Sequence, residues 1–82
     1  MSVNTSIAEV ILNMITEVLE VPEGTITSDQ CFQDIGMQSI GFINIIIKCE
    51  TEFDVEFEDD MFLSTRFPTI ADFISYVESL IQ

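Results

Sequence analysis

The sequence predicts a small all-α protein, a four-helix bundle of three longer helices and one short helix, in a single domain over residues 1–82. Three segments repeat apolar residues at i, i+3, i+4 and i+7, the spacing that places them on one face of a helix. A chain of this size buries only about 60–65% of its unfolded surface. That is enough for one small core and too little for a deep catalytic cleft between lobes.

The first helix is predicted by an apolar stripe made of Ile7, Val10, Ile11, Met14, Ile15, Val18 and Leu19. Ser6 and Glu9 have the spacing of a capping box, in which the hydroxyl and the carboxylate each satisfy an unpaired backbone N–H. Pro22 disfavours helical geometry at the residue before it. The helix is therefore expected to end near Leu19 or Glu20.

Residues 20–38 form a long connection after this helix. Loops in compact domains are usually about 4–6 residues long, and much longer ones are often functional. Isolated apolar residues at Ile26, Phe32 and Ile35 could hold the loop against the core. A short helical turn after Thr27 or Ser28 would shorten it.

The second helix is expected to start at Ser39, a candidate N-cap. Its inner face would carry Phe42, Ile45, Ile46, Cys49 and Phe53, and its outer face Ile40, Ile43 and Ile47 with Asn44 among them. A helix that is apolar all round is normally buried all round, which a domain this small cannot achieve. The outer isoleucines therefore either cover the long loop or face a partner.

A β-hairpin is the alternative for residues 45–58, where β-branched residues are followed by alternating apolar and acidic ones. No Asn-Gly or similar turn separates the two runs, and two strands alone would lack a third to complete a sheet. Helix is therefore the preferred interpretation.

The last helix is predicted after Pro68, with an apolar stripe of Ile70, Phe73, Ile74, Val77, Leu80 and Ile81. Thr69 and Asp72 have the spacing of a weaker capping box. Between the second and last helices, residues 59–65 could form a short helical turn that bears Met61, Phe62 and Leu63.

The charge excludes several functions. The chain has 15 Asp and Glu, 2 Lys and Arg and no histidine, for a net charge of −13. Two cations cannot neutralise a phosphate backbone, so nucleic-acid binding is not expected, and the same repulsion opposes an anionic membrane surface. The longest apolar stretch is too short to span a bilayer, so no membrane insertion is expected. Without histidine, no side chain has an ordinary pKa near neutrality for acid–base catalysis.

Neither cysteines nor acidic residues form a metal motif. Cys31 and Cys49 lack CxxC spacing and histidine neighbours, so both are expected to be free thiols in a reducing cytoplasm. The acidic run that begins at Asp54 is not an EF-hand, because Asp59 and Thr65 stand where that loop requires Gly and Glu. A solvated acidic turn is the expected structure.

The segment Phe32-Gln33-Asp34-Ile35-Gly36-Met37-Gln38-Ser39-Ile40 resembles the F-x-x-L-G-x-[DN]-S-L signature of acyl and peptidyl carrier proteins. The resemblance covers nearly the whole chain. It includes the amphipathic first helix, the long loop, the Phe53-to-Phe57 connection, the short third helix and the Thr-initiated last helix.

This resemblance implies an acyl-carrier-protein-like fold and a carrier that is not itself an enzyme. It implies that Ser39 bears 4′-phosphopantetheine, donated by coenzyme A through a magnesium-dependent phosphopantetheinyl transferase. A serine at a helix start also suits a phosphate, because unpaired N–H groups and the helix dipole favour negative charge there. The implied partners are the transferase, acyl- or aminoacyl-loading enzymes, and condensing or transferase enzymes. A monomer is expected, with docking through Gln38, Ile40, Ile43, Asn44, Ile47 and Met61.

The chain departs from the family pattern at three positions. Gln38 and Ile40 flank the serine where the family commonly has Asp and Leu, and Asn44 stands where fatty-acid carriers commonly have Glu. The docking face is thus more apolar, which suggests a specialised natural-product pathway of polyketide or nonribosomal-peptide type. The alternatives are a carrier for general fatty-acid synthesis, an acidic protein-interaction module and a nucleic-acid mimic.

Overall fold

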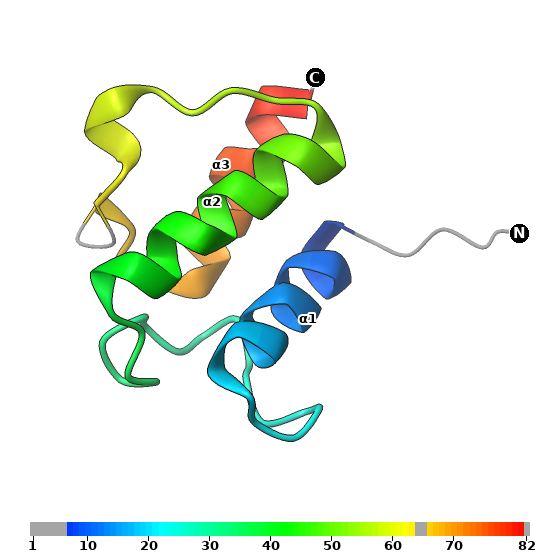
Figure 1. Cartoon of the computed structure of the whole chain (residues 1–82), viewed down its shortest axis with the longest axis vertical. Coiled ribbons are helices and arrows are strands. Elements are labelled where there is room, and N and C mark those ends of the chain that lie inside the picture. The colour runs from blue at the N-terminus through cyan, green and yellow to red at the C-terminus, as the bar shows by residue number, and fades with distance from the viewer. Residues whose placement is uncertain (1–6, 64–65, 82) are drawn as a thin grey trace, which may run out of the picture.

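The computed structural model describes residues 7–63 and 66–81 and is helical (Figure 1). Its elements are α1 (Ile7–Leu19), α2 (Ser39–Phe53), the 3-10 turn η1 (Asp59–Met61) and α3 (Ile70–Ile81). The described residues contain no strand, so the β-hairpin alternative is wrong. None of the helices in these two ranges is both long and apolar enough to cross a bilayer. The short helix predicted over residues 59–65 is observed in part, as η1 followed by Phe62 and Leu63, and residues 64–65 lie outside the described residues.

The three α-helices enclose a core of aliphatic and aromatic side chains. Helix α1 packs against both α2 and α3. Between α2 and α3 the rings of Phe42 and Phe73 lie 5.6 Å apart, and Phe32 from the long loop lies 5.1 Å from Phe42 and 5.6 Å from Phe73. These edge-to-face pairs fix the loop against the two helices. The predicted inner face of α2 is confirmed, because Phe42, Ile45, Ile46 and Cys49 are buried and Phe53 is half-buried.

Helix α1 ends where Pro22 predicts. Glu20 has a left-handed backbone with φ of 56°. The N–H of Val21 donates to the carbonyl of Thr16 at 3.2 Å, and the N–H of Glu20 donates to that of Glu17 at 3.2 Å. This pair of bonds is a Schellman motif, which satisfies carbonyls that the last turn leaves open. The predicted capping box at the other end includes Ser6, which lies outside the described residues.

Residues 20–38 form a loop with no assigned helix, although the Gln30 N–H donates to the carbonyl of Thr27 at 3.3 Å in a single hydrogen-bonded turn. Ile26 and Phe32 are buried and Ile35 is partly buried against the core, as predicted. The loop also caps α3, because the N–H groups of Ile70 and Ala71 donate to the carbonyls of Gln30 and Ser28 at 2.9 and 2.8 Å. Two N–H groups that a helix start leaves unpaired are thereby satisfied.

The predicted capping box of α3 is confirmed. The Asp72 carboxylate accepts from the Thr69 N–H at 3.1 Å and from its hydroxyl at 2.9 Å, while the Asp72 N–H donates to the Thr69 hydroxyl at 3.3 Å.

At the end of α2, Asp54 has φ of 55°, and the Glu50 carboxylate accepts from the Phe57 N–H at 2.9 Å. The left-handed backbone of Asp54 and this hydrogen bond turn the chain out of α2 toward η1.

Candidate functional site

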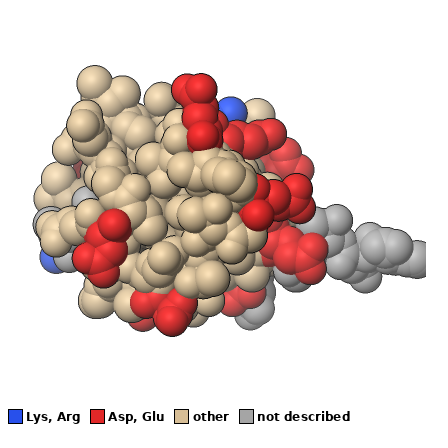
Figure 2. Space-filling view, turned by 90° about the horizontal axis from the view of Figure 1, so that it is seen from below, with Lys and Arg blue, Asp and Glu red and all other residues tan. Residues whose placement is uncertain are grey.

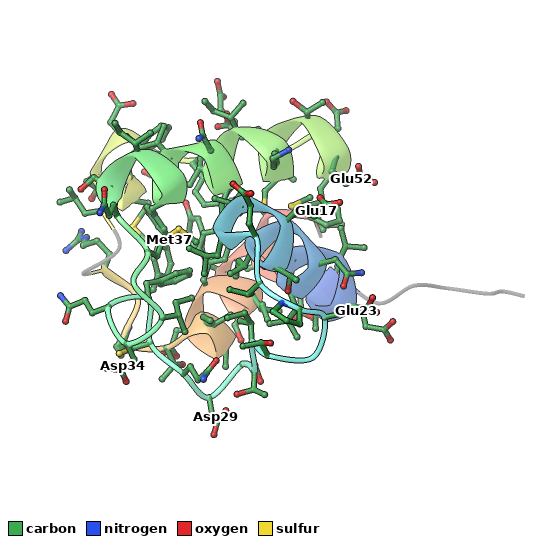
Figure 3. The ribbon with its side chains drawn as sticks, turned by 60° about the horizontal axis from the view of Figure 1, so that its bottom comes forward. Glu17, Glu23, Asp29, Asp34, Met37 and Glu52 are labelled. Atoms are coloured by element: carbon green, nitrogen blue, oxygen red, sulfur yellow. The ribbon has the colours of Figure 1, made fainter. Side chains whose placement is uncertain are left out.

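The loop delivers the residues before α2 to the surface through one tight turn. Phe32 and Met37 are buried, and the N–H of Met37 donates to the carbonyl of Phe32 at 3.0 Å. Gly36 lies in this turn with φ of 78°, a conformation that L side chains rarely adopt. With both ends of the turn anchored, the chain runs from the buried Met37 out to the exposed Gln38 and Ser39. Figure 3 shows Met37 directed toward the interior.

Ser39 lies at the first helical position of α2, and Gln38 is the N-cap. The prediction of Ser39 as the N-cap is therefore wrong by one residue. Gln38 has extended backbone, its side chain makes no capping bond, and its carbonyl accepts from the N–H of Phe42 at 2.9 Å. The buried Met37 and the Gly36 turn set this start, in place of a serine cap.

The Ser39 side chain is exposed, and its hydroxyl has no hydrogen-bond partner among residues 7–63 and 66–81. The hydroxyl thus makes no interaction that modification would break. The first turn of α2 contains no acidic residue, and its first N–H groups have no helical acceptor. Positive partial charge therefore lies beside the hydroxyl, where it favours an attached phosphate. These features fit a phosphodiester on Ser39.

Gly41 is a residue of the site that sequence reasoning missed. A Cβ at this position would lie 2.8 Å from the Sδ of Met37 and 3.6 Å from a methyl group of Val18. The missing side chain lets the start of α2 lie close against α1 and the loop. A lone glycine inside a predicted helix was the only sequence signal for this close approach.

The outer face of α2 is open to solvent. Ile40 is 75% exposed, Ile43 37% and Ile47 52%. Gln38, the N-cap of α2, and Asn44, within the helix, are also exposed. The long loop therefore does not cover these isoleucines, and of the two interpretations left open by the sequence, the one in which they face outward is consistent with the structure.

Met61 is placed differently from the other five predicted docking residues. It lies at the end of η1, is partly buried and packs against the core. Leu63, just after it, is 59% exposed. The structure thus places four of the residues on α2 and Gln38 at its N-cap, and leaves Met61 on a separate turn.

The acidic residues gather no metal site in the part of the chain that the structure describes, where no group of three or more potential ligands lies close together. Asp60 instead pairs with Arg66, whose Nη2 lies 3.0 Å from its carboxylate. Figure 2 shows Asp and Glu scattered around the face seen from below, with its middle uncharged.

The two cysteines are free thiols, as expected. Cys31 is partly exposed, whereas Cys49 is buried with its Sγ 3.8 Å from the Sδ of Met14. Burial, with a smaller effect of the Glu50 carboxylate, raises the pKa of Cys49 from 9.0 to about 12. This thiol is not a nucleophile at neutral pH.

Comparison with known proteins gives one family. A family model described as a phosphopantetheine attachment site matches residues 9–77, a range that includes Ser39. The chain is 30% identical over 77 residues to acyl carrier protein 3 of Ralstonia nicotianae, covering 93% of this chain and 86% of that protein. It is 27% identical over 74 residues to an acyl carrier protein of Prochlorococcus marinus, covering 89% of this chain and 90% of that protein.

Proposed function

Because the chain belongs to the acyl carrier protein family, whose members carry phosphopantetheine and are not enzymes, we propose that Ser39 is its attachment residue. The observation that supports this most is the exposed Ser39 hydroxyl, which has no partner in the described residues and lies at the start of α2. A serine that capped its helix would lose a structural bond on modification. This one has none to lose.

In this proposal, the residues of the chain hold the attached group in place and do not act as an enzyme. The Ser39 oxygen becomes the bridging oxygen of the phosphodiester, and the N–H groups of the first turn of α2 stabilise the phosphate charge. When attached, the group supplies a terminal thiol that holds acyl cargo as a thioester. A cargo tethered in this way has a high effective concentration at any enzyme that docks beside Ser39.

We further propose that partner enzymes dock on Gln38, Ile40, Ile43, Asn44 and Ile47, with Met61 at the margin. Residues 39–47 contain no charge, and their isoleucines are exposed. Contact with this face buries apolar surface, whereas the acidic residues elsewhere steer basic partners over a screening length of about 8 Å. The partners are the transferase, a loading enzyme for acyl or aminoacyl groups, and condensing or transferase enzymes.

An uncharged docking face favours a dedicated set of partners in a specialised natural-product pathway over general fatty-acid synthesis. Exchange of this protein into a fatty-acid synthase system tests the choice. Poor activity is expected, because enzymes that recognise acidic carriers would meet Asn44 and exposed isoleucines. Full activity would support the alternative carrier.

We also infer a monomer in the cytoplasm. The free thiols Cys31 and Cys49 suit a reducing compartment. A net charge of −13 opposes the approach of a second copy. Sedimentation at physiological salt should give the mass of one chain.

The experiment that tests the carrier function uses the apo protein with coenzyme A, magnesium and a broad-specificity phosphopantetheinyl transferase. Intact-mass analysis should show the gain of one phosphopantetheine group. An acidic interaction module or a nucleic-acid mimic would gain none. Peptide mapping then identifies the modified residue, which should be Ser39.

A further inference from the structure

The core contains a polar group that has no hydrogen-bond partner in the described residues, the hydroxyl of Tyr76 on α3. This hydroxyl is buried, and the Tyr76 ring packs between Phe57 and Phe67, whose ring centroids lie 5.2 and 5.6 Å away. A buried hydroxyl without a partner costs free energy, and buried tyrosine hydroxyls usually have one. A polar atom brought to this point by a bound molecule would therefore be stabilised.

The surroundings of the hydroxyl restrict the chemistry of that molecule. The rings of Phe57 and Phe67 carry no charge, so an ionised group such as the ammonium of an aminoacyl cargo would lose its hydration beside them. A saturated acyl chain would suit the rings but would leave the Tyr76 hydroxyl unpaired. An acyl chain with a neutral carbonyl or hydroxyl oxygen satisfies both the rings and the hydroxyl.

The η1 turn can move to admit such a chain. Phe57 packs on Tyr76 and also, with ring centroids 6.5 Å apart, on Phe62, which follows η1. The N–H groups of Met61 and Phe62 donate to carbonyls of the same turn, at 2.9 and 3.3 Å. In the part of the chain that the structure describes, no backbone hydrogen bond joins residues 58–63 to an α-helix. Side-chain packing holds this turn in place, so it can shift without loss of a backbone bond.

Tyr76 lies within reach of cargo attached at Ser39. Phe42 is three residues beyond Ser39, about 4.5 Å along the axis of α2. From Phe42 the ring centroids lead to Phe67 over 6.1 Å and on to Tyr76 over 5.6 Å. A phosphopantetheine arm has about 14 bonds from the serine oxygen to its sulfur, which is about 17 Å when extended. The first carbons of the cargo can therefore reach the Tyr76 hydroxyl.

We propose that Tyr76 is a specificity-determining residue, whose hydroxyl bonds to a carbonyl or hydroxyl oxygen near the thioester end of the acyl cargo. The protein then holds oxygenated acyl groups more tightly than saturated ones. This inference rests on the proposed function, because the cargo must first be attached at Ser39.

The test compares the melting temperatures of the full chain loaded by the transferase from hexanoyl-coenzyme A or from 3-oxohexanoyl-coenzyme A. The 3-oxohexanoyl form of the wild type should melt about 4 °C or more above the hexanoyl form, because one hydrogen bond is gained. This difference should vanish in Tyr76→Phe. It should persist in the matched control Ser79→Ala, which removes an exposed hydroxyl of the same helix that donates to the Tyr76 carbonyl at 2.6 Å.

A second measurement reports the hydrogen bond itself. With a ¹³C label at the 3-oxo carbon, the carbonyl resonance of the loaded wild type should lie downfield of that in loaded Tyr76→Phe. The unloaded Tyr76→Phe protein should melt at or above the temperature of the unloaded wild type, because it loses only an unpaired hydroxyl. A lower temperature would mean that the hydroxyl already has a partner, and would overturn the inference.

Equal melting temperatures of the two loaded wild-type forms would also overturn it, as would a difference that survives in Tyr76→Phe. Neither result affects the carrier function. Failure of Ser39 to take up either group would instead contradict the proposed function itself.

Discussion

The Sδ of Met37 fills the space where Gly41 would carry a Cβ, only 2.8 Å from that position. Ser39 lies between these two residues in the chain. The contact holds the start of α2 against the loop, and the burial of Met37, only 7% exposed, makes it part of the core. The placement of the candidate site thus depends on packing directly beneath it.

A larger side chain at Gly41 should disturb this contact. Gly41→Leu is expected to lower the free energy of unfolding by about 1–3 kcal/mol, because extra methylenes enter a filled space. Gly41→Ala should cost less, since alanine favours helix and the end of Met37 is flexible. Urea unfolding measures both. Adding Met37→Ala to Gly41→Leu should make the pair of changes less damaging than their sum; strict additivity would contradict the contact.

The C-cap of α1 is a site where stability can be gained. Glu20 is held at φ of 56°, and a left-handed backbone costs an L residue about 1–2 kcal/mol. Glu20→Gly should therefore raise the free energy of unfolding, by about 1 kcal/mol. Glu20→Ala removes the same charge and keeps the strained backbone, so it serves as the control. Equal effects of the two variants in urea unfolding would assign the change to charge alone.

The buried thiol of Cys49 should be inert in the folded protein. An aromatic disulfide reagent at neutral pH should react with Cys31 first and with Cys49 only after denaturation. Rapid reaction of two thiols in the native protein would contradict the burial of Cys49, which is 0% exposed.

The same thiol predicts a loss of stability at high pH. Its pKa is raised on folding to about 12 from 9.0, so above pH 9 the unfolded state releases a proton that the folded state retains. The contribution of Cys49 is fully present below pH 9 and is lost as pH rises toward 12. Cys49→Ala should flatten this part of the stability curve relative to the wild type, as measured by denaturant unfolding across the range.

Substitutions of two isoleucines of α2 should distinguish a residue needed for folding from a residue needed for docking. Ile46 is fully buried, so Ile46→Ala should lower the free energy of unfolding by about 2–5 kcal/mol. Ile40 is 75% exposed, so Ile40→Ala should change it by less than about 0.5 kcal/mol. In the transferase assay, Ile40→Ala should raise KM. An unchanged KM would remove Ile40 from the proposed docking face.

The helices could be predicted because apolar spacing and cap residues are local signals. Pro22 predicted the end of α1, and Thr69 with Asp72 predicted the start of α3. The start of α2 was displaced by one residue, because serine is a favoured N-cap whereas here the burial of Met37 sets where the helix begins. Local preference was overridden by packing.

The long-range relationships could not be predicted from local patterns. The Ser28 and Gln30 carbonyls of the loop cap α3, some forty residues away in sequence, and no local pattern indicates this. The path of that loop also decides whether the outer isoleucines of α2 are covered, which periodicity left open. Likewise, Glu17 and Glu52 line one shallow groove only because α1 packs on α2.

The most direct test of attachment at Ser39 is peptide mapping of the wild-type protein and of Ser39→Ala, each after treatment with the transferase and coenzyme A. The wild-type chain should carry one phosphopantetheine group on the peptide that contains Ser39, and the variant should carry none. Because the hydroxyl makes no bond in the described residues, the two proteins should differ in free energy of unfolding by less than about 0.5 kcal/mol. A group found on another residue, or still gained by the variant, would contradict the account.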